Sequence, residues 1–128
     1  MRMETPIKRV RGYGSARTGA HHWWTERLSS VSTLVLFVWF VVSLVRLPDL
    51  DHGTVVEWLS SPLAAVPMIL LIISTFWHLK MGLQVVWEDY IHESTKLFSI
   101  VLTNFLSIAG AALAIFAVLK IAFGGDAN

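Results

Sequence analysis

Hydrophobic residues in this chain gather in three long runs that lack the alternation of a half-buried β-strand. The runs cover residues 28–47, 63–90 and 97–123. A membrane-spanning helix needs about 20 predominantly apolar residues, so each run is long enough to cross a bilayer. A transmembrane β-barrel would require alternating polarity. Because helices satisfy their own backbone hydrogen bonds in lipid, the pattern predicts an all-α integral membrane protein with three transmembrane helices.

The polar stretches between the runs differ in charge, and this difference predicts the orientation. Residues 1–27 form a basic N-terminal segment, and residues 28–128 form the three-helix anchor. The basic residues ahead of the first run are Arg2, Lys8, Arg9, Arg11, Arg17 and Arg27. The next loop instead holds Asp49, Asp51 and Glu57. The positive-inside rule therefore predicts a cytoplasmic N-terminus and a periplasmic C-terminus.

The first segment also bears on the compartment. It is polar and interrupted by Pro6 and several glycines, unlike a cleavable signal with its early apolar core. No transit peptide is recognisable, which favours the bacterial inner (cytoplasmic) membrane.

Composition narrows the classes of function. The 128 residues are 55% hydrophobic and only 15% charged, which is too apolar for a soluble domain of this size. The chain has no cysteine, so disulfides and thiolate-ligated iron–sulfur or zinc sites are excluded. The net charge of +1 indicates no nucleic-acid partner.

Two local patterns predict how the helices are capped and packed. The segment "TVVE" at 54–57 has the spacing of a capping box and predicts a short surface helix before Pro62, anchored by Trp58. The third run carries a patch of small residues, namely Ser107, Ala109, Gly110, Ala111 and Ala114. Such patches allow close helix packing. Three helices alone would expose much small and polar surface, so a partner subunit is expected.

The second run contains two ionisable residues at membrane depth, His78 and Lys80. Such residues are costly in lipid and mark candidate functional sites. Lys80 can extend its amine toward the cytoplasmic interface. His78 is shorter, which leaves three interpretations: a neutral imidazole bonded to a neighbouring helix, a proton relay, or a haem ligand.

The spacing around His78 adds to the picture. Gly82 and Asp89 share its face at 3.6 residues per turn, as do Ser74 and Val85. A glycine one turn after the histidine leaves room for a flat macrocycle or for a packed helix. Asp89 lies roughly 16 Å further along the helix, beside Tyr90. Taken singly, Tyr90 fits an aromatic-belt residue and Asp89 a solvated helix end.

Taken together, these residues resemble a known family. The stretch "HLKMGLQVVWEDY" (78–90) resembles the haem-and-quinone segment of the small membrane anchor subunit of succinate dehydrogenase, in respiratory complex II. The stretch "SARTGAHHWWTER" (15–27) is similar to the motif that precedes the first helix in the same family. The resemblance covers nearly the whole chain, and Lys80 is one departure from the pattern.

The resemblance implies roles for individual residues. His78 would be one axial ligand of a haem b, and the other ligand would come from the larger, cytochrome b anchor subunit. Tyr90 would donate a hydrogen bond to ubiquinone, with Asp89 orienting groups or supplying protons there. Arg27 and His21 would lie near the haem propionates or the quinone pocket, since cationic donors suit carboxylates.

The resemblance also implies a division of chemistry among subunits. A flavoprotein subunit would oxidise succinate, an iron–sulfur subunit would carry the electrons, and this chain would anchor both in the lipid membrane without being catalytic by itself. Two alternatives remain, namely a fumarate reductase anchor built from similar parts and a haem-free membrane scaffold or assembly protein. A two-haem, four-histidine cytochrome is disfavoured because its spans would need paired histidines.

Overall fold

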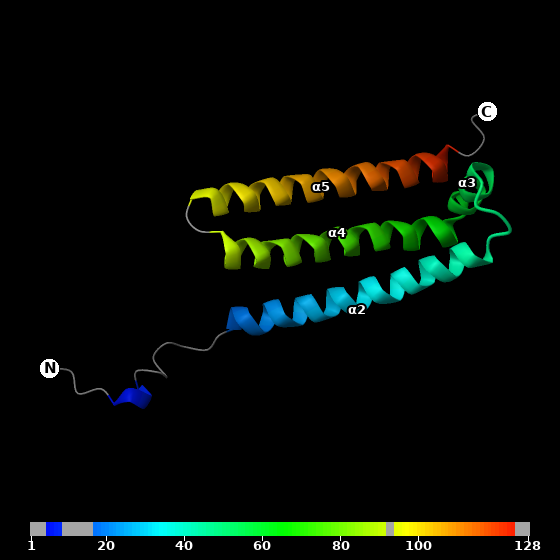
Figure 1. The fold of residues 1–128 in the computed structure, drawn as a ribbon. Coiled ribbons are helices and arrows are strands. Elements are labelled where there is room, and N and C mark those ends of the chain that lie inside the picture. The colour runs from blue at the N-terminus through cyan, green and yellow to red at the C-terminus, as the bar shows by residue number, and fades with distance from the viewer. Residues whose placement is uncertain (1–4, 9–16, 92–93, 125–128) are drawn as a thin grey trace.

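The long helices lie side by side in a single layer. The computed structural model describes residues 5–8, 17–91 and 94–124. Its main helices are α2 (Arg17–Arg46), α3 (His52–Ser60), α4 (Pro62–Tyr90) and α5 (Ser94–Phe123). Helix α4 lies in the middle of the layer, with α2 along one edge and α5 along the other (Figure 1). The short α3 contacts α4 and α5 at the end of the layer where α4 begins.

The three predicted transmembrane helices are confirmed. Helices long and apolar enough to cross a membrane run over Gly19–Arg46, Pro62–Tyr90 and Thr95–Phe123. Helix α2 begins at Arg17, ahead of the apolar run that starts at Leu28. Backbone hydrogen bonding does not require apolar side chains, and no proline interrupts this part of the chain, so the helix continues through the polar residues. Arg2, Arg9 and Arg11 lie outside the described residues.

The short helix between the first two spans is confirmed, but its predicted cap is wrong. Its N-cap is Asp51, whose carboxylate accepts a hydrogen bond from the backbone N–H of Thr54 at 3.1 Å. Hydrogen bonds from the side chain and backbone of Thr54 lower the pKa of Asp51. A carboxylate is a good acceptor that also favours the positive end of the helix dipole, so the helix starts ahead of Thr54. Trp58 stacks on Trp39 of α2, with ring centroids 6.0 Å apart.

The contact between α4 and α5 uses the predicted small-residue patch. A side chain at Gly110 would place its Cβ 2.8 Å from the ring of Phe76, so the ring would have to shift to admit any larger residue. Ser107 is 7% exposed within the same contact. Towards the other end of the interface, the indole N–H of Trp87 donates a hydrogen bond to Thr103 Oγ1 at 2.8 Å. Close packing and one polar bond therefore join the two helices.

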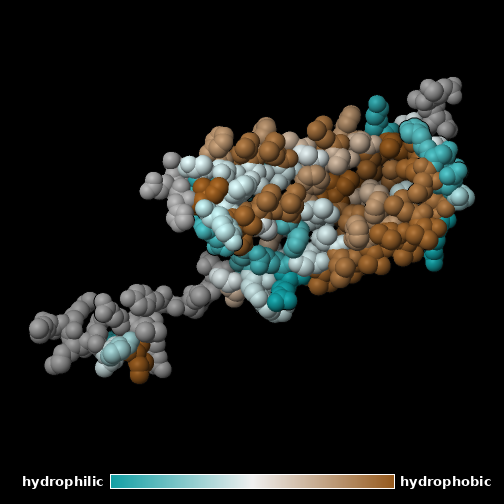
Figure 2. Space-filling view, viewed as in Figure 1, coloured by the Kyte–Doolittle hydropathy of each residue, from teal (hydrophilic) through white to brown (hydrophobic). Residues whose placement is uncertain are grey.

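Large apolar side chains remain exposed along all three long helices. Among the described residues only a few are buried, namely Leu59, Ala64, Ala65, Leu71, Met81, Ser107 and Val118. Figure 2 shows apolar residues over much of the visible face, whereas hydrophilic residues gather at the ends and extend inward where α2 begins and α4 ends. A single layer of helices cannot bury its own apolar surface, so lipid or partner helices must cover both of its faces.

Candidate functional site

Two pairs of polar side chains join α2 to α4. Thr33 Oγ1 and Ser74 Oγ lie 2.6 Å apart. One helical turn away, Ser29 Oγ lies 3.3 Å from Nδ1 of His78. The first of the three interpretations of His78, a hydrogen bond with a neighbouring helix, therefore agrees with the structure. This bond uses only one of the two ring nitrogens, so it leaves Nε2 for another partner.

The face of α4 that carries His78 is open. The His78 side chain is exposed despite its contact with Ser29. At Gly82, one turn further on, an added Cβ would meet no atom within 4 Å. Gly82 therefore differs from Gly110, where the ring of Phe76 occupies the space that a side chain would take. The space at Gly82 can accept a flat group or a helix from outside the chain.

Asp89 and Tyr90 lie at the end of α4. The backbone N–H of Ile91 bonds to the carbonyl of Trp87 at 3.1 Å and closes the last turn. Both side chains are exposed, and Tyr90 is 80% accessible. A carboxylate and a phenol hydroxyl are therefore both open to a molecule that approaches this end of the layer.

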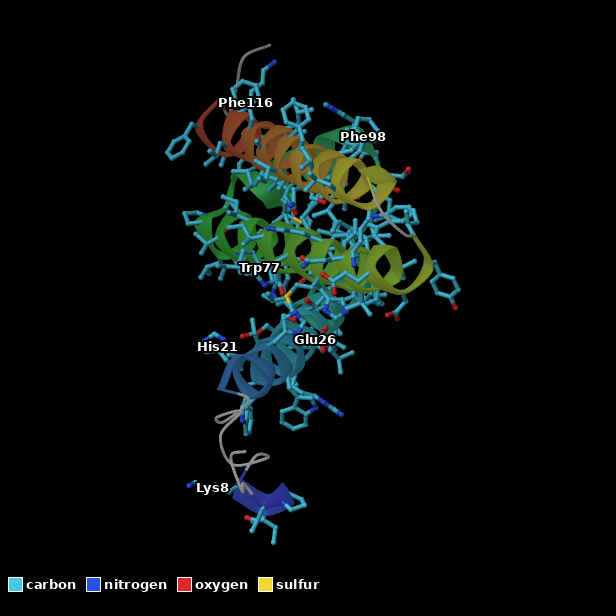
Figure 3. All side chains as sticks on the ribbon, turned by 90° about the vertical axis from the view of Figure 1, so that its left-hand side faces the viewer. Lys8, His21, Glu26, Trp77, Phe98 and Phe116 are labelled. Carbon is cyan, nitrogen blue, oxygen red and sulfur yellow. The ribbon has the colours of Figure 1, made fainter. Side chains whose placement is uncertain are left out.

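His21 lies in a different place from His78. It lines a groove of about 390 Å³ between α2 and α4. The lining residues are His21, His22, Thr25, Trp77, Lys80, Met81 and Gln84. Figure 3 shows His21 and Trp77 on the same side of the layer. The structure thus brings His21 close to Lys80 of α4, while His78 makes its contact with Ser29.

Lys80 does not extend as the sequence suggested. Its Nζ lies over the ring of Trp77, 5.4 Å from the centroid. Side chains of a helix lean toward its N-terminus, which for α4 is the direction away from Tyr90. The amine is therefore held by the indole instead of reaching toward the Tyr90 end, where the cytoplasmic interface was expected.

Arg27 lies on the outer side of α2. Its guanidinium carbon is 5.1 Å from the centroid of the Trp23 ring, and both side chains are exposed. Arg27 and Ser29 are two positions apart in the helix, so they point in nearly opposite directions. Since Ser29 faces His78, the structure does not bring Arg27 and His78 together.

Sequence reasoning missed Ser29. The signal was a cluster of hydroxyl residues at the start of the first apolar run, "SSVST" at 29–33, in which Ser29 and Thr33 share one face. Hydroxyl side chains at such spacing commonly bond to a neighbouring membrane helix. Within the described ranges, no group of three or more histidine or acidic residues could hold a metal ion by itself.

Comparison with known proteins places this geometry in context. Residues 1–119 match the family described as succinate dehydrogenase/fumarate reductase transmembrane subunit. The chain is 26% identical over 114 residues to the succinate dehydrogenase hydrophobic membrane anchor subunit of Rickettsia bellii, covering 86% of this chain and 91% of the relative.

A second relative, the protein of the same description from Rickettsia conorii, is 28% identical over 86 residues, covering 66% of this chain and 68% of the relative. The corresponding subunit of Rickettsia typhi is 25% identical over 114 residues, with coverages of 86% and 91%. No solved structure gives a significant match.

Proposed function

The chain belongs to the succinate dehydrogenase/fumarate reductase transmembrane subunit family, and on this premise we propose that it anchors a succinate:quinone oxidoreductase in the membrane. In this role it binds the iron–sulfur and flavoprotein subunits, contributes one axial ligand to a haem b, and completes a ubiquinone site. The observation that carries the proposal is the face of α4 on which an exposed His78, an uncrowded Gly82 and an exposed Asp89 lie, next to Tyr90 at the helix end.

The described residues fit one side of a haem. His78 is exposed and has a second ring nitrogen beyond the one that contacts Ser29. The open space at Gly82 would leave room for the edge of a macrocycle. A haem b carries single electrons, and the role of His78 is to hold its iron. Because His78 is the only histidine deep within a span of this sequence, a second ligand to the iron would come from the larger cytochrome b anchor subunit.

The quinone site lies at the end of α4. Tyr90 donates its hydroxyl hydrogen to a quinone carbonyl, and Asp89 orients neighbouring groups or supplies protons. The exposure of both side chains supports this assignment. Quinone reduction consumes protons, so a position at the wet end of the helix suits the reaction.

Arg27 and His21 lie nearer the start of α2, and Figure 1 places the start of α2 at the same end of the layer as the end of α4. We propose that Arg27 and His21 bind acidic groups at the end of the layer where α2 begins, including the haem propionates, because cationic and N–H donors bind carboxylates. Arg27 reaches such a group by leaving the ring of Trp23, an exposed contact that stabilises it by only about 0.5–1 kcal/mol.

The orientation follows from the charges outside the spans. The basic N-terminal segment lies in the cytoplasm of a bacterial cell, and the C-terminus lies in the periplasm. The Tyr90 end of α4 then faces the cytoplasm, where succinate is oxidised. Reporter fusions ahead of Arg2 and after Asn128 test this arrangement. A periplasmic signal from the N-terminal fusion would place the quinone site on the wrong side.

The chain has neither a dinucleotide-binding motif nor a cysteine for an iron–sulfur cluster, so the flavin- and cluster-dependent steps of succinate oxidation would take place in its partners. The family description also covers fumarate reductases, which supports a fumarate reductase anchor as the second candidate. The quinone distinguishes the two, since a low-potential quinone favours fumarate reduction and ubiquinone favours succinate oxidation.

Purification of the complex through a tag on this chain tests the proposed function. The preparation should contain flavin, iron–sulfur clusters and a second membrane subunit, and it should reduce ubiquinone with succinate. A tagged chain that purifies from its native membrane without these components would support the scaffold alternative and contradict the anchor role.

A further inference from the structure

We propose that Ser29 is a positioning residue for His78, because its hydroxyl keeps the imidazole proton on Nδ1 and presents Nε2 to the iron. This inference rests on the proposed haem ligation and extends it to a residue of α2. The contact that carries it is the 3.3 Å approach of Ser29 Oγ to Nδ1 of His78.

The direction of this hydrogen bond follows from counting protons. A serine hydroxyl has one proton and two lone pairs. Ser29 donates its proton to the backbone carbonyl of Glu26 at 2.9 Å. With the hydroxyl hydrogen directed to the Glu26 carbonyl, the oxygen is the acceptor toward His78, and Nδ1 carries the hydrogen in this arrangement. In a neutral imidazole only one nitrogen is protonated, so Nε2 has a free lone pair, as metal ligation requires.

The neighbouring contacts distinguish this role from general helix packing. Thr33 and Ser74 already join α2 to α4 through a shorter hydrogen bond of 2.6 Å, one turn away. Ser30 donates to the same carbonyl of Glu26 at 2.8 Å, but it is exposed on α2. Ser30 thus makes the same hydrogen bond to the Glu26 carbonyl as Ser29 does, and Thr33 also joins α2 to α4. Of these three residues, only Ser29 contacts a ring nitrogen of His78.

A hydrogen bond to the far nitrogen of a ligating histidine fixes the plane of the ring and raises the basicity of the ligand. A more basic ligand stabilises the oxidised iron. Loss of the acceptor at position 29 should therefore raise the haem midpoint potential. It should also change the g-values of the oxidised haem, since the ring becomes free to turn. Removal of such a supporting residue typically weakens metal binding by about 10–100-fold.

The test uses the purified four-subunit complex and two pairs of variants. Ser29→Thr and Ser29→Val have nearly the same shape and differ in the hydroxyl, so they separate the hydrogen bond from packing. Ser30→Ala removes a neighbouring hydroxyl that bonds only to the backbone. Thr33→Val breaks the other tie between α2 and α4 without touching His78.

The expected result is a raised potential and shifted g-values in Ser29→Val, with Ser29→Thr, Ser30→Ala and Thr33→Val close to wild type. Haem in Ser29→Val should also be lost more readily during purification. Unchanged potential and g-values in Ser29→Val would overturn the role of Ser29 while leaving haem ligation intact. An equal shift in Thr33→Val would also overturn it, since helix packing would then be the cause. A wild-type complex without haem would instead contradict the proposed function itself.

Discussion

Helix α4 meets its two neighbours through different chemistry. Toward α5 the contact is tight, with the ring of Phe76 packed where Gly110 has no side chain and with Trp87 bonded to Thr103. Toward α2 the contacts are pairs of polar side chains, Thr33 with Ser74 and Ser29 with His78. The two contacts toward α5 are made within the chain, although a groove of about 450 Å³ remains beside Trp87 and Thr103. On the α2 side, the contact with Ser29 uses only one ring nitrogen of His78.

Gly110 on α5 and Gly82 on α4 differ in the same way. Gly110 is a glycine because another part of this chain occupies the space, and Gly82 borders space that no part of the described chain fills. From sequence alone helix packing was possible for both, and for Gly82 room for a flat macrocycle was equally open, since membrane helices commonly use glycine for close approach. The structure separates a contact made within the chain, at Gly110, from a position that the described residues leave uncovered, at Gly82.

The largest effect is expected when the open space is filled. Gly82→Leu should leave the packing of α2, α4 and α5 intact, because an added Cβ there meets no atom within 4 Å. In the purified complex it should remove most of the haem, since a leucine occupies the space assigned to the macrocycle. Haem content per flavin measures this effect. Wild-type haem content in Gly82→Leu would contradict the assignment of the haem to this face of α4.

A smaller but still large effect is expected at the other end of the same open surface. Tyr90→Phe removes the hydroxyl and leaves a quinone carbonyl without its donor, a loss of about 1–3 kcal/mol. Succinate–quinone activity should fall by roughly one to two powers of ten. Assembly, haem content and reduction of artificial dyes through the soluble subunits should be unchanged.

The alternative for Tyr90 is an aromatic-belt residue, which acts through its ring at the headgroup level. Phenylalanine would largely preserve that anchoring. Wild-type quinone kinetics in Tyr90→Phe would therefore favour the belt interpretation.

Substitutions in the α4–α5 contact should lower the stability of the complex and leave its cofactor content unchanged. Gly110→Leu forces a side chain into the ring of Phe76 and should destabilise the α4–α5 contact by about 1–3 kcal/mol. Ala112→Leu is the matched control, because Ala112 is exposed on the same helix. Thermal inactivation of the complex should occur at a lower temperature in the first variant only. Equal behaviour of the two would show that the Phe76–Gly110 contact does not stabilise the layer.

The smallest effect is expected from the hydrogen bond in the same interface. Trp87→Phe keeps an aromatic ring but removes the N–H that donates to Thr103, so the cost should be about 0.5–1.5 kcal/mol. Trp24→Phe provides the control, because Trp24 is 68% exposed on α2. A slightly lower inactivation temperature for Trp87→Phe, with quinone activity retained, would agree with a structural role. A selective loss of quinone activity would assign Trp87 to the quinone site instead.

The sequence predicted the features that depend on composition and periodicity along one helix. The three spans and the small-residue patch around Gly110 belong to this group. The resemblance of the segment with His78, Asp89 and Tyr90 came instead from similarity to a known family, which the family match confirms. These features need no knowledge of how one helix is placed against another.

The features that sequence missed depend on contacts between separate elements or on competition between local bonds. Ser29 meets His78 because of the register between α2 and α4, which no single helix specifies. Asp51 displaced Thr54 as the cap because two acceptors competed for one helix start. The amine of Lys80 lies over the ring of Trp77, whereas the sequence predicted that it would extend toward the cytoplasmic interface.

The most direct test of the haem assignment is the reduced-minus-oxidised spectrum of the purified complex, compared between wild type and His78→Ala. The wild-type complex should have a b-type band with about one haem for each flavin. The His78→Ala complex should lose or shift that band, because one axial nitrogen is gone. An unchanged band and haem content in His78→Ala, or no band in the wild-type complex, would contradict the assignment of His78 as a haem ligand.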